Sequence, residues 1–93
     1  GEAIEMRLVI DGKRLDTEKA ALHLAMACWD GHNNITGDLY KSSKGQWYMH
    51  TPSQWSNGQH WILTNPHEII EMYRDFFEED EIEIISSHIE DWE

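Results

Sequence analysis

Cysteine and basic residues are scarce in this chain, and each scarcity excludes a class of protein. The single cysteine, Cys28, rules out an intramolecular disulfide and a disulfide-stapled secreted scaffold. Seven basic residues stand against 18 acidic ones, so the net charge of −11 disfavours direct binding to a phosphate backbone. No apolar run approaches the ~20 residues that span a bilayer, and the start lacks a secretory signal. We therefore expect a cytoplasmic protein that contacts neither nucleic acid directly nor a membrane.

Catalytic motifs are also missing from the sequence. Cys28 lies in an apolar stretch that would not activate a thiol, and no serine lies in a nucleophile elbow. The six histidines never pair at the i, i+4 spacing of a helical zinc site. His60 and His67, with Glu68 or Glu71, could meet only if the chain folds back between them. We predict a non-enzymatic protein without metal or cofactor, with a small His/carboxylate metal-dependent enzyme as an alternative.

The residues that are present suffice for one folded domain. Hydrophobic residues make up 40% of the 93-residue chain and include five tryptophans, which argues against disorder. A chain of this size supports one modest core, so we predict a single domain over residues 1–93. Because the sequence starts with Gly1 instead of methionine, Met6 is a candidate native start, and residues 1–5 are then a cloning remnant.

The first third of the chain predicts a hairpin followed by a helix. Alternating apolar residues before Asp11 indicate a short strand, and Asp11-Gly12 suits the two positive-φ positions of a type I′ turn. Asp16 or Thr17 can cap the element that follows. The sequence from there to Trp29 is apolar on nearly every side, so we predict a central, buried helix that ends near this residue.

The middle of the chain predicts antiparallel strands. Residues 32–38 are polar and rich in turn formers, which is typical of a loop. Segments 39–41 and 46–50 flank a turn that ends at Gly45, and 60–63 have the composition of a further strand. Short connections between successive strands favour a meander with one packed face.

Two helices are predicted at the C-terminal end. Asn65-Pro66 places a capping side chain before a proline at the first helical position, so a helix should run to about Glu78. Apolar residues at spacings of three and four predict a second helix over 80–92, with a strand at 82–84 as the alternative. The predicted fold class is α+β, with a three- to four-stranded antiparallel sheet, one central apolar helix and two acidic C-terminal helices.

Two short stretches carry a family resemblance. They are IDGKRLDTEKA at residues 10–20 and LYKSSKGQWY at residues 39–48. With the acidic end, they resemble a family of small, functionally uncharacterised phage and mobile-element accessory proteins of Gram-positive bacteria. Leu15 stands where that family has an aromatic residue, and residues 51–59 replace its glycine-rich loop. The resemblance implies a mobile-element accessory protein and no particular chemistry.

Most of the negative charge lies in the last third of the chain. From Trp61 onward eleven acids accompany one base, whereas the first 60 residues carry seven acids and six bases. Solubility alone does not require such clustering, although a purely solvating role stays open. The pattern predicts a negative surface that engages a basic groove on a protein partner. The acids expected to supply it are Glu71, Asp75, Glu78, Glu79, Asp80, Glu81 and Glu83.

An aromatic residue of the meander is expected to anchor that interaction. If Trp47 points into the core, then strand alternation directs Tyr48 away from it. We therefore predict Tyr48 or Trp55 as an apolar anchor. The predicted function is an acidic protein-binding module, in the form of a nucleic-acid mimic that inhibits a restriction, CRISPR or other DNA-handling system. The alternative is a homo-oligomeric structural or regulatory module that associates through exposed tryptophans.

Overall fold

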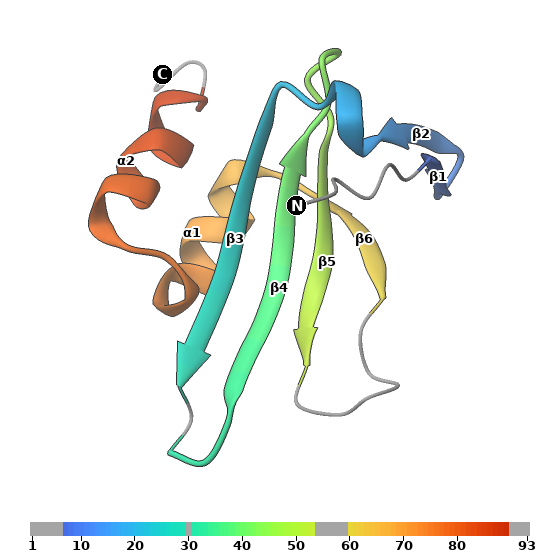
Figure 1. The fold of residues 1–93 in the computed structure, drawn as a ribbon. Helices are drawn as coiled ribbons and strands as arrows, with labels where there is room; N and C mark the ends of the chain where they lie inside the picture. Colours follow the sequence, from blue (N-terminus) through green and yellow to red (C-terminus); the bar gives the residue numbers. More distant parts are fainter. Residues whose placement is uncertain (1–6, 30, 54–59, 90–93) are drawn as a thin grey trace.

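A four-stranded antiparallel sheet lies between a helical layer and a small hairpin in the computed structural model, which describes residues 7–29, 31–53 and 60–89 (Figure 1). The α+β class and the antiparallel meander are therefore confirmed. The strands follow one another across the sheet in chain order, and they are β3 (Leu22–Trp29), β4 (Asn34–Lys41), β5 (Trp47–Ser53) and β6 (Trp61–Thr64). The prediction that residues 1–5 derive from cloning concerns a segment outside the described residues.

The N-terminal hairpin is as predicted. Strands β1 (Arg7–Ile10) and β2 (Lys13–Asp16) pair antiparallel across a two-residue turn. Asp11 has φ 49° and Gly12 has φ 80°, the positive values that a type I′ turn requires. The Asp16 side chain caps the next element, but that element is only the short 3-10 turn η1 (Thr17–Lys19).

The predicted central helix is wrong, because Leu22–Trp29 forms strand β3. Every residue of β3 has a partner in β4, from Leu22 opposite Lys41 to Trp29 opposite Asn34. Strand β4 also takes in most of the segment predicted as a loop, since it begins at Asn34. A long antiparallel ladder between the two segments satisfies the backbone polar groups that a helix would have paired internally.

A bulge interrupts the pairing of β4 with β5. Asp38 lies opposite His50, whereas Thr36 lies opposite Ser53, so β5 contains one extra residue there. Gly37 lies at this point, and a Cβ atom on it would be 2.5 Å from the His50 carbonyl oxygen. Only glycine permits so close an approach of the two backbones.

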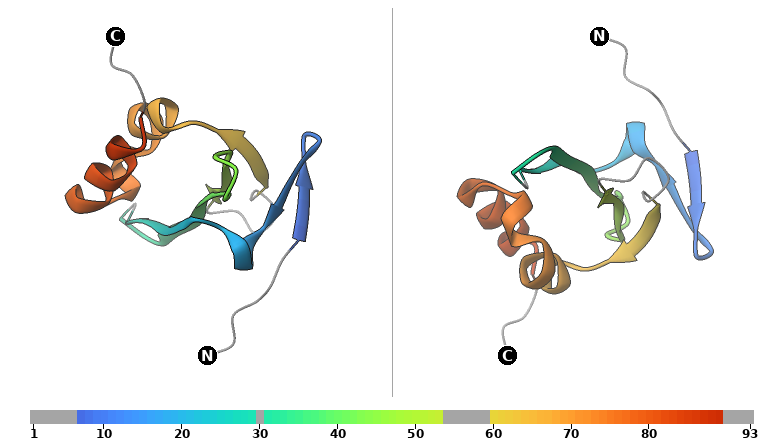
Figure 2. Two further views of the ribbon diagram at one scale, coloured as in Figure 1. Left: turned by 90° about the horizontal axis from the view of Figure 1, so that it is seen from above. Right: turned by 90° about the horizontal axis from the view of Figure 1, so that it is seen from below.

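The C-terminal helical layer covers one face of the sheet (Figure 2). It consists of α1 (Pro66–Tyr73), the 3-10 turn η2 (Arg74–Phe76) and α2 (Glu79–Ser87). The Asn65 side chain caps α1 by accepting a 2.9 Å hydrogen bond from the amide three residues later, as predicted. The first helix ends earlier than expected. The second helix is confirmed, and the strand alternative at 82–84 is wrong.

Two clusters of buried side chains lie on opposite faces of the sheet. The larger cluster, between sheet and helices, contains Met26, Leu39, Trp47, Met49, Ile69 and Ile85. The smaller cluster, beneath the hairpin, contains Ile10, Leu15 and Tyr48. Neighbouring residues of β5 are therefore both buried, because the hairpin covers the face that the prediction left open. None of the helices in the described part is long and apolar enough to cross a membrane.

Candidate functional site

The seven predicted acids lie on α1, η2 and α2, whose apolar side chains face the sheet. Ile69, Ile82 and Ile85 form the buried side of these elements. Glu81 is half-buried, and the other six acids are exposed. We call the seven residues the acidic layer; they are Glu71, Asp75, Glu78, Glu79, Asp80, Glu81 and Glu83.

Three acids of this layer stabilise the start of α2. The Glu78 amide donates a 2.9 Å hydrogen bond to Oε1 of Glu81, and the Glu81 amide donates a 3.0 Å hydrogen bond to Oδ1 of Asp80. The Glu78 side chain completes a reciprocal capping box by accepting from the Glu81 amide. Negative charge at a helix N-terminus is also favoured by the helix dipole. These three residues therefore have a structural reason to be acidic.

Glu71, Asp75 and Glu83 have no such role. Their side chains form no hydrogen bond or ion pair with any of the residues that the structure describes. Glu83 lies four residues after Glu79 in α2, a spacing at which like charges repel one another. The negative charge of Glu83 therefore costs stability, and none of the three charges forms a contact within the described residues, which leaves solvation or partner binding as their role.

Of the two predicted aromatic anchors, one is buried and the other lies outside the described residues. Tyr48 is 1% exposed and packs against Ile10 and Leu15 beneath the hairpin, so its prediction as a surface anchor is wrong. Trp55 lies outside the described residues. The error arose because strand alternation gives the face of a side chain but not what covers that face.

Two aliphatic side chains in the acidic layer's own elements were missed from the sequence. Met72 in α1 is 64% exposed, and Ile84 in α2 is 39% exposed. Each lies one position after an acid, Glu71 or Glu83 respectively. Helical periodicity could have predicted their exposure, because neither residue lies on the buried face of its helix, which the neighbouring isoleucines define. Exposed aliphatic groups among charges are suitable anchors for a protein partner.

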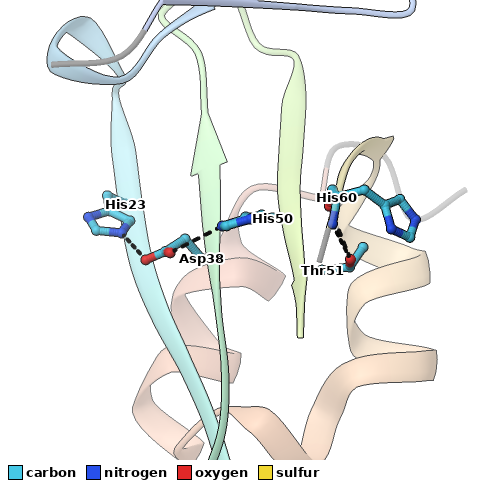
Figure 3. Close-up of polar contacts among 5 residues, drawn as sticks. All are labelled: His23, Asp38, His50, Thr51 and His60. Atoms are coloured by element: carbon cyan, nitrogen blue, oxygen red, sulfur yellow. Dashed lines mark hydrogen bonds and ion pairs between the residues drawn. The ribbon is translucent and has the colours of Figure 1, made fainter. Parts of the chain in front are cut away.

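A row of polar side chains crosses the part of the sheet that the hairpin leaves open (Figure 3). One carboxylate, Asp38 on β4, lies between two imidazoles from the neighbouring strands. Its Oδ1 is 3.0 Å from Nε2 of His23, and its Oδ2 is 3.8 Å from Nδ1 of His50. All three side chains are partly exposed, at 48%, 38% and 27% for His23, Asp38 and His50.

Aromatic rings hold both imidazoles of this row. His23 stacks on Tyr40 with 4.3 Å between ring centroids, and His50 stacks on Trp61 with 4.7 Å between centroids. Burial, and then the negative charge of Asp38, raise the pKa of Tyr40. No local pattern in the sequence indicates this row, because its members come from different strands and meet only through the sheet register.

The histidine pair considered for a metal site lies elsewhere. His60 precedes β6, where its backbone amide donates a 3.1 Å hydrogen bond to Oγ1 of Thr51 (Figure 3), and His67 is exposed in the first turn of α1. In residues 7–29, 31–53 and 60–89, no group of three or more His, Cys, Asp or Glu side chains could hold a metal ion. The row at Asp38 is therefore one carboxylate hydrogen-bonded to His23 and close to His50, and not a metal-ligand set.

Positive charge gathers on the opposite side of the sheet from the acidic layer. Arg7, Arg14 and Lys19 lie on the N-terminal hairpin and η1, and Lys44 lies in the β4–β5 turn. Figure 2 shows this hairpin and the two helices on opposite sides of the sheet. The fold therefore separates acids and bases in space, although the seven acids and six bases of the first 60 residues nearly cancel.

Comparison of the chain with protein-family models, with curated proteins and with solved structures gives no match. Any function assigned to the chain therefore rests on its own residues and geometry.

Proposed function

We propose that the protein is a non-enzymatic protein-binding module whose acidic layer engages a basic surface on a partner protein. The observation that supports this proposal most directly is the exposure of Glu71, Asp75 and Glu83 without a partner among the described residues. The clustering of charge also creates a directional field, which accelerates association with an oppositely charged surface. Met72 and Ile84 supply apolar contact area within the same layer.

The partner class that fits best is a protein that handles nucleic acid. Such proteins carry a basic groove built to accept a row of phosphates, and a row of carboxylates competes for the same groove. The acidic layer then mimics a nucleic-acid backbone and inhibits the partner, as a restriction or CRISPR inhibitor would. The repulsion between the chain and nucleic acid makes this partner a protein and not the nucleic acid itself.

The decisive experiment measures binding of a purified captured partner as a function of salt and charge. Reversal of Glu71, Asp75 and Glu83 to Lys should lower the affinity by about 100-fold or more at low salt. Glu18→Lys is the control for reversing an acid outside the acidic layer, because Glu18 is exposed on η1 and away from the helical layer. Affinity that is indifferent to both salt and the triple reversal would contradict the proposal. Competition by duplex DNA for the same partner tests the mimicry separately.

The aliphatic anchors provide a second arm of the experiment. Met72→Ala and Ile84→Ser should each weaken binding about tenfold, which is the typical effect of truncating an interface anchor. Their effect should persist at high salt, because removal of apolar contact area is not screened by ions. If only the charge variants weaken binding, the interaction is purely electrostatic and the anchors are not used.

A homo-oligomeric module is the second candidate, and strand β3 favours it. This edge strand of the sheet has eight residues, none of them charged or proline. Trp29 at its end is 65% exposed. Long apolar edge strands without such protective residues tend to pair with other strands. Sedimentation that shows a monomer over a wide concentration range would exclude this candidate, whereas a dimer that Ala25→Lys dissociates would support it.

A further inference from the structure

A cavity of about 470 Å³ lies between the N-terminal hairpin, η1 and the β4–β5 turn, on the side of the molecule away from the acidic layer. Four cations line it, Arg7, Arg14, Lys19 and Lys44, against the single carboxylate of Asp16. Four of the chain's seven basic residues therefore surround one hollow in a protein of net charge −11. Its volume lies in the range of small-molecule sites.

Three of the residues that line the cavity also line a second hollow beside it. Arg14, Ser42 and Lys44 line this cavity and also a neighbouring hollow of about 600 Å³. They therefore form the wall that the two hollows share. A guanidinium, a hydroxyl and an ammonium group on one wall are the donors with which proteins hold a phosphate group.

The backbone around this wall is fixed by hydrogen bonds. The Tyr48 hydroxyl donates a 2.8 Å hydrogen bond to the carbonyl oxygen of Arg14, which ties the hairpin to the sheet. Oγ of Ser42 accepts hydrogen bonds from the amides of Lys44 at 3.3 Å and Gln46 at 3.1 Å. A hydroxyl that accepts two bonds still has its own hydrogen to donate. The backbone that carries the wall is therefore fixed by hydrogen bonds within the protein.

The charge at this wall is not neutralised within the protein. Arg7 lies 3.5 Å from Asp16, so this carboxylate is already engaged. No ion pair of Arg14, Lys19 or Lys44 is formed within the described residues. The surface beside the cations is apolar, because Leu8 is half-buried and Val9 is 72% exposed, with Leu15 buried beneath them. The cavity thus combines a positive wall with an apolar surface.

We propose that this cavity binds a phosphate monoester of mononucleotide size. The phosphate group lies against Arg14, Lys44 and the Ser42 hydroxyl, and the organic part of the ligand covers the apolar side chains of Leu8 and Val9. The proposal is independent of the acidic layer, because it concerns different residues on the other side of the sheet.

The test is a titration of the full chain, followed by ¹⁵N NMR, with adenosine monophosphate, adenosine and inorganic phosphate as separate probes. Adenosine monophosphate should give saturable shifts at residues of the cavity, with adenosine and phosphate each about tenfold weaker because each offers half of the contacts. Lys44→Ala should weaken binding about tenfold, and Lys44→Arg should restore most of it. Arg74→Ala is the matched control, since it removes the same charge from η2 in the helical layer.

Four outcomes would overturn the proposal. The first is shifts that do not saturate, and the second is equal affinity for adenosine and adenosine monophosphate. The third is an equal effect of Lys44→Ala and Arg74→Ala, which would mean that net charge alone matters. If Lys44→Glu instead abolishes a concentration-dependent self-association while adenosine monophosphate does not bind, the basic wall serves a second copy's acidic layer and the ligand proposal is wrong. Lys44 is exposed in a turn, so these variants should fold.

Discussion

The Tyr48 hydroxyl on β5 donates a 2.8 Å hydrogen bond to the backbone carbonyl oxygen of Arg14 on β2. This bond joins the N-terminal hairpin to the central sheet at the edge of the basic cavity. Tyr48→Phe should lower the free energy of unfolding by about 1–2 kcal/mol, because the carbonyl oxygen of this part-buried hydrogen bond loses its donor. Tyr40→Phe is the control, since no hydrogen bond of the Tyr40 hydroxyl occurs within the described residues. Equal urea midpoints for the two variants would contradict this account.

The same tyrosine predicts a loss of stability at alkaline pH. Burial raises the pKa of Tyr48 above its ordinary value of 10.0. A raised pKa means that the folded state favours the neutral phenol. Its contribution to stability is therefore complete below pH 10.0 and is lost as the pH rises through the folded-state pKa. Urea unfolding between about pH 9 and 11 should show a steeper decline for the native chain than for Tyr48→Phe. Parallel declines would show that Tyr48 does not titrate differently in the two states.

Gly37 should not tolerate a side chain. An added Cβ would lie 2.5 Å from the His50 carbonyl oxygen and 3.0 Å from the Pro52 nitrogen, and both are backbone atoms that cannot rotate away. Gly37→Ala should therefore destabilise the protein by about 1–3 kcal/mol or separate the β4–β5 bulge. Ala27→Thr adds atoms to an exposed position on β3 and should change stability by less than about 0.5 kcal/mol. An equal decrease in Tm for Gly37→Ala and Ala27→Thr would argue against the close approach of the β4 and β5 backbones at Gly37.

Two adjacent isoleucines in α2 differ in burial, and substitution of each one tests the orientation of the helix on the sheet. Ile85 is fully buried against the sheet, whereas Ile84 is 39% exposed. Ile85→Ala should cost about 2–5 kcal/mol of stability, and Ile84→Ala should cost less than about 0.5 kcal/mol. In the strand alternative at 82–84, Ile84 would share a face with Ile82 and the two costs would move closer together. Denaturant unfolding of both variants measures the two costs, and equal costs would contradict the different burial of Ile84 and Ile85.

Local chemistry made much of this fold predictable. Asp11-Gly12 specifies a turn because both residues readily adopt positive φ. Asn65-Pro66 specifies a helix start because the Asn65 side chain caps the helix and the φ of Pro66 is already helical. Neither depends on distant residues. The acids of α1 and α2 were likewise expected on the outer side, because the isoleucine spacing defines the buried stripe.

Strand β3 could not be predicted in the same way. Its inward residues, Leu24 and Met26, alternate with Ala25 and Ala27, which are apolar although they are exposed. The period of two was therefore hidden, and the alanines favoured a helix by intrinsic propensity. Pairing with β4 decided the outcome, and pairing is a tertiary property. The burial of Tyr48 and the meeting of distant bases at the cavity depend on the same non-local contacts.

Glu83 offers the test that separates solvation from partner binding. It repels Glu79 at the i, i+4 spacing of α2, and no ion pair within the described residues offsets that cost. Glu83→Lys replaces this repulsion with a favourable Glu-to-Lys pair and should raise the free energy of unfolding by about 0.5–1 kcal/mol at low salt. The gain should shrink in about 1 M NaCl, because exposed charges are screened. A stabilised variant that also loses affinity for its partner shows that the acid is retained for binding at a cost in stability. A stabilised variant with unchanged affinity assigns Glu83 to the solvated surface.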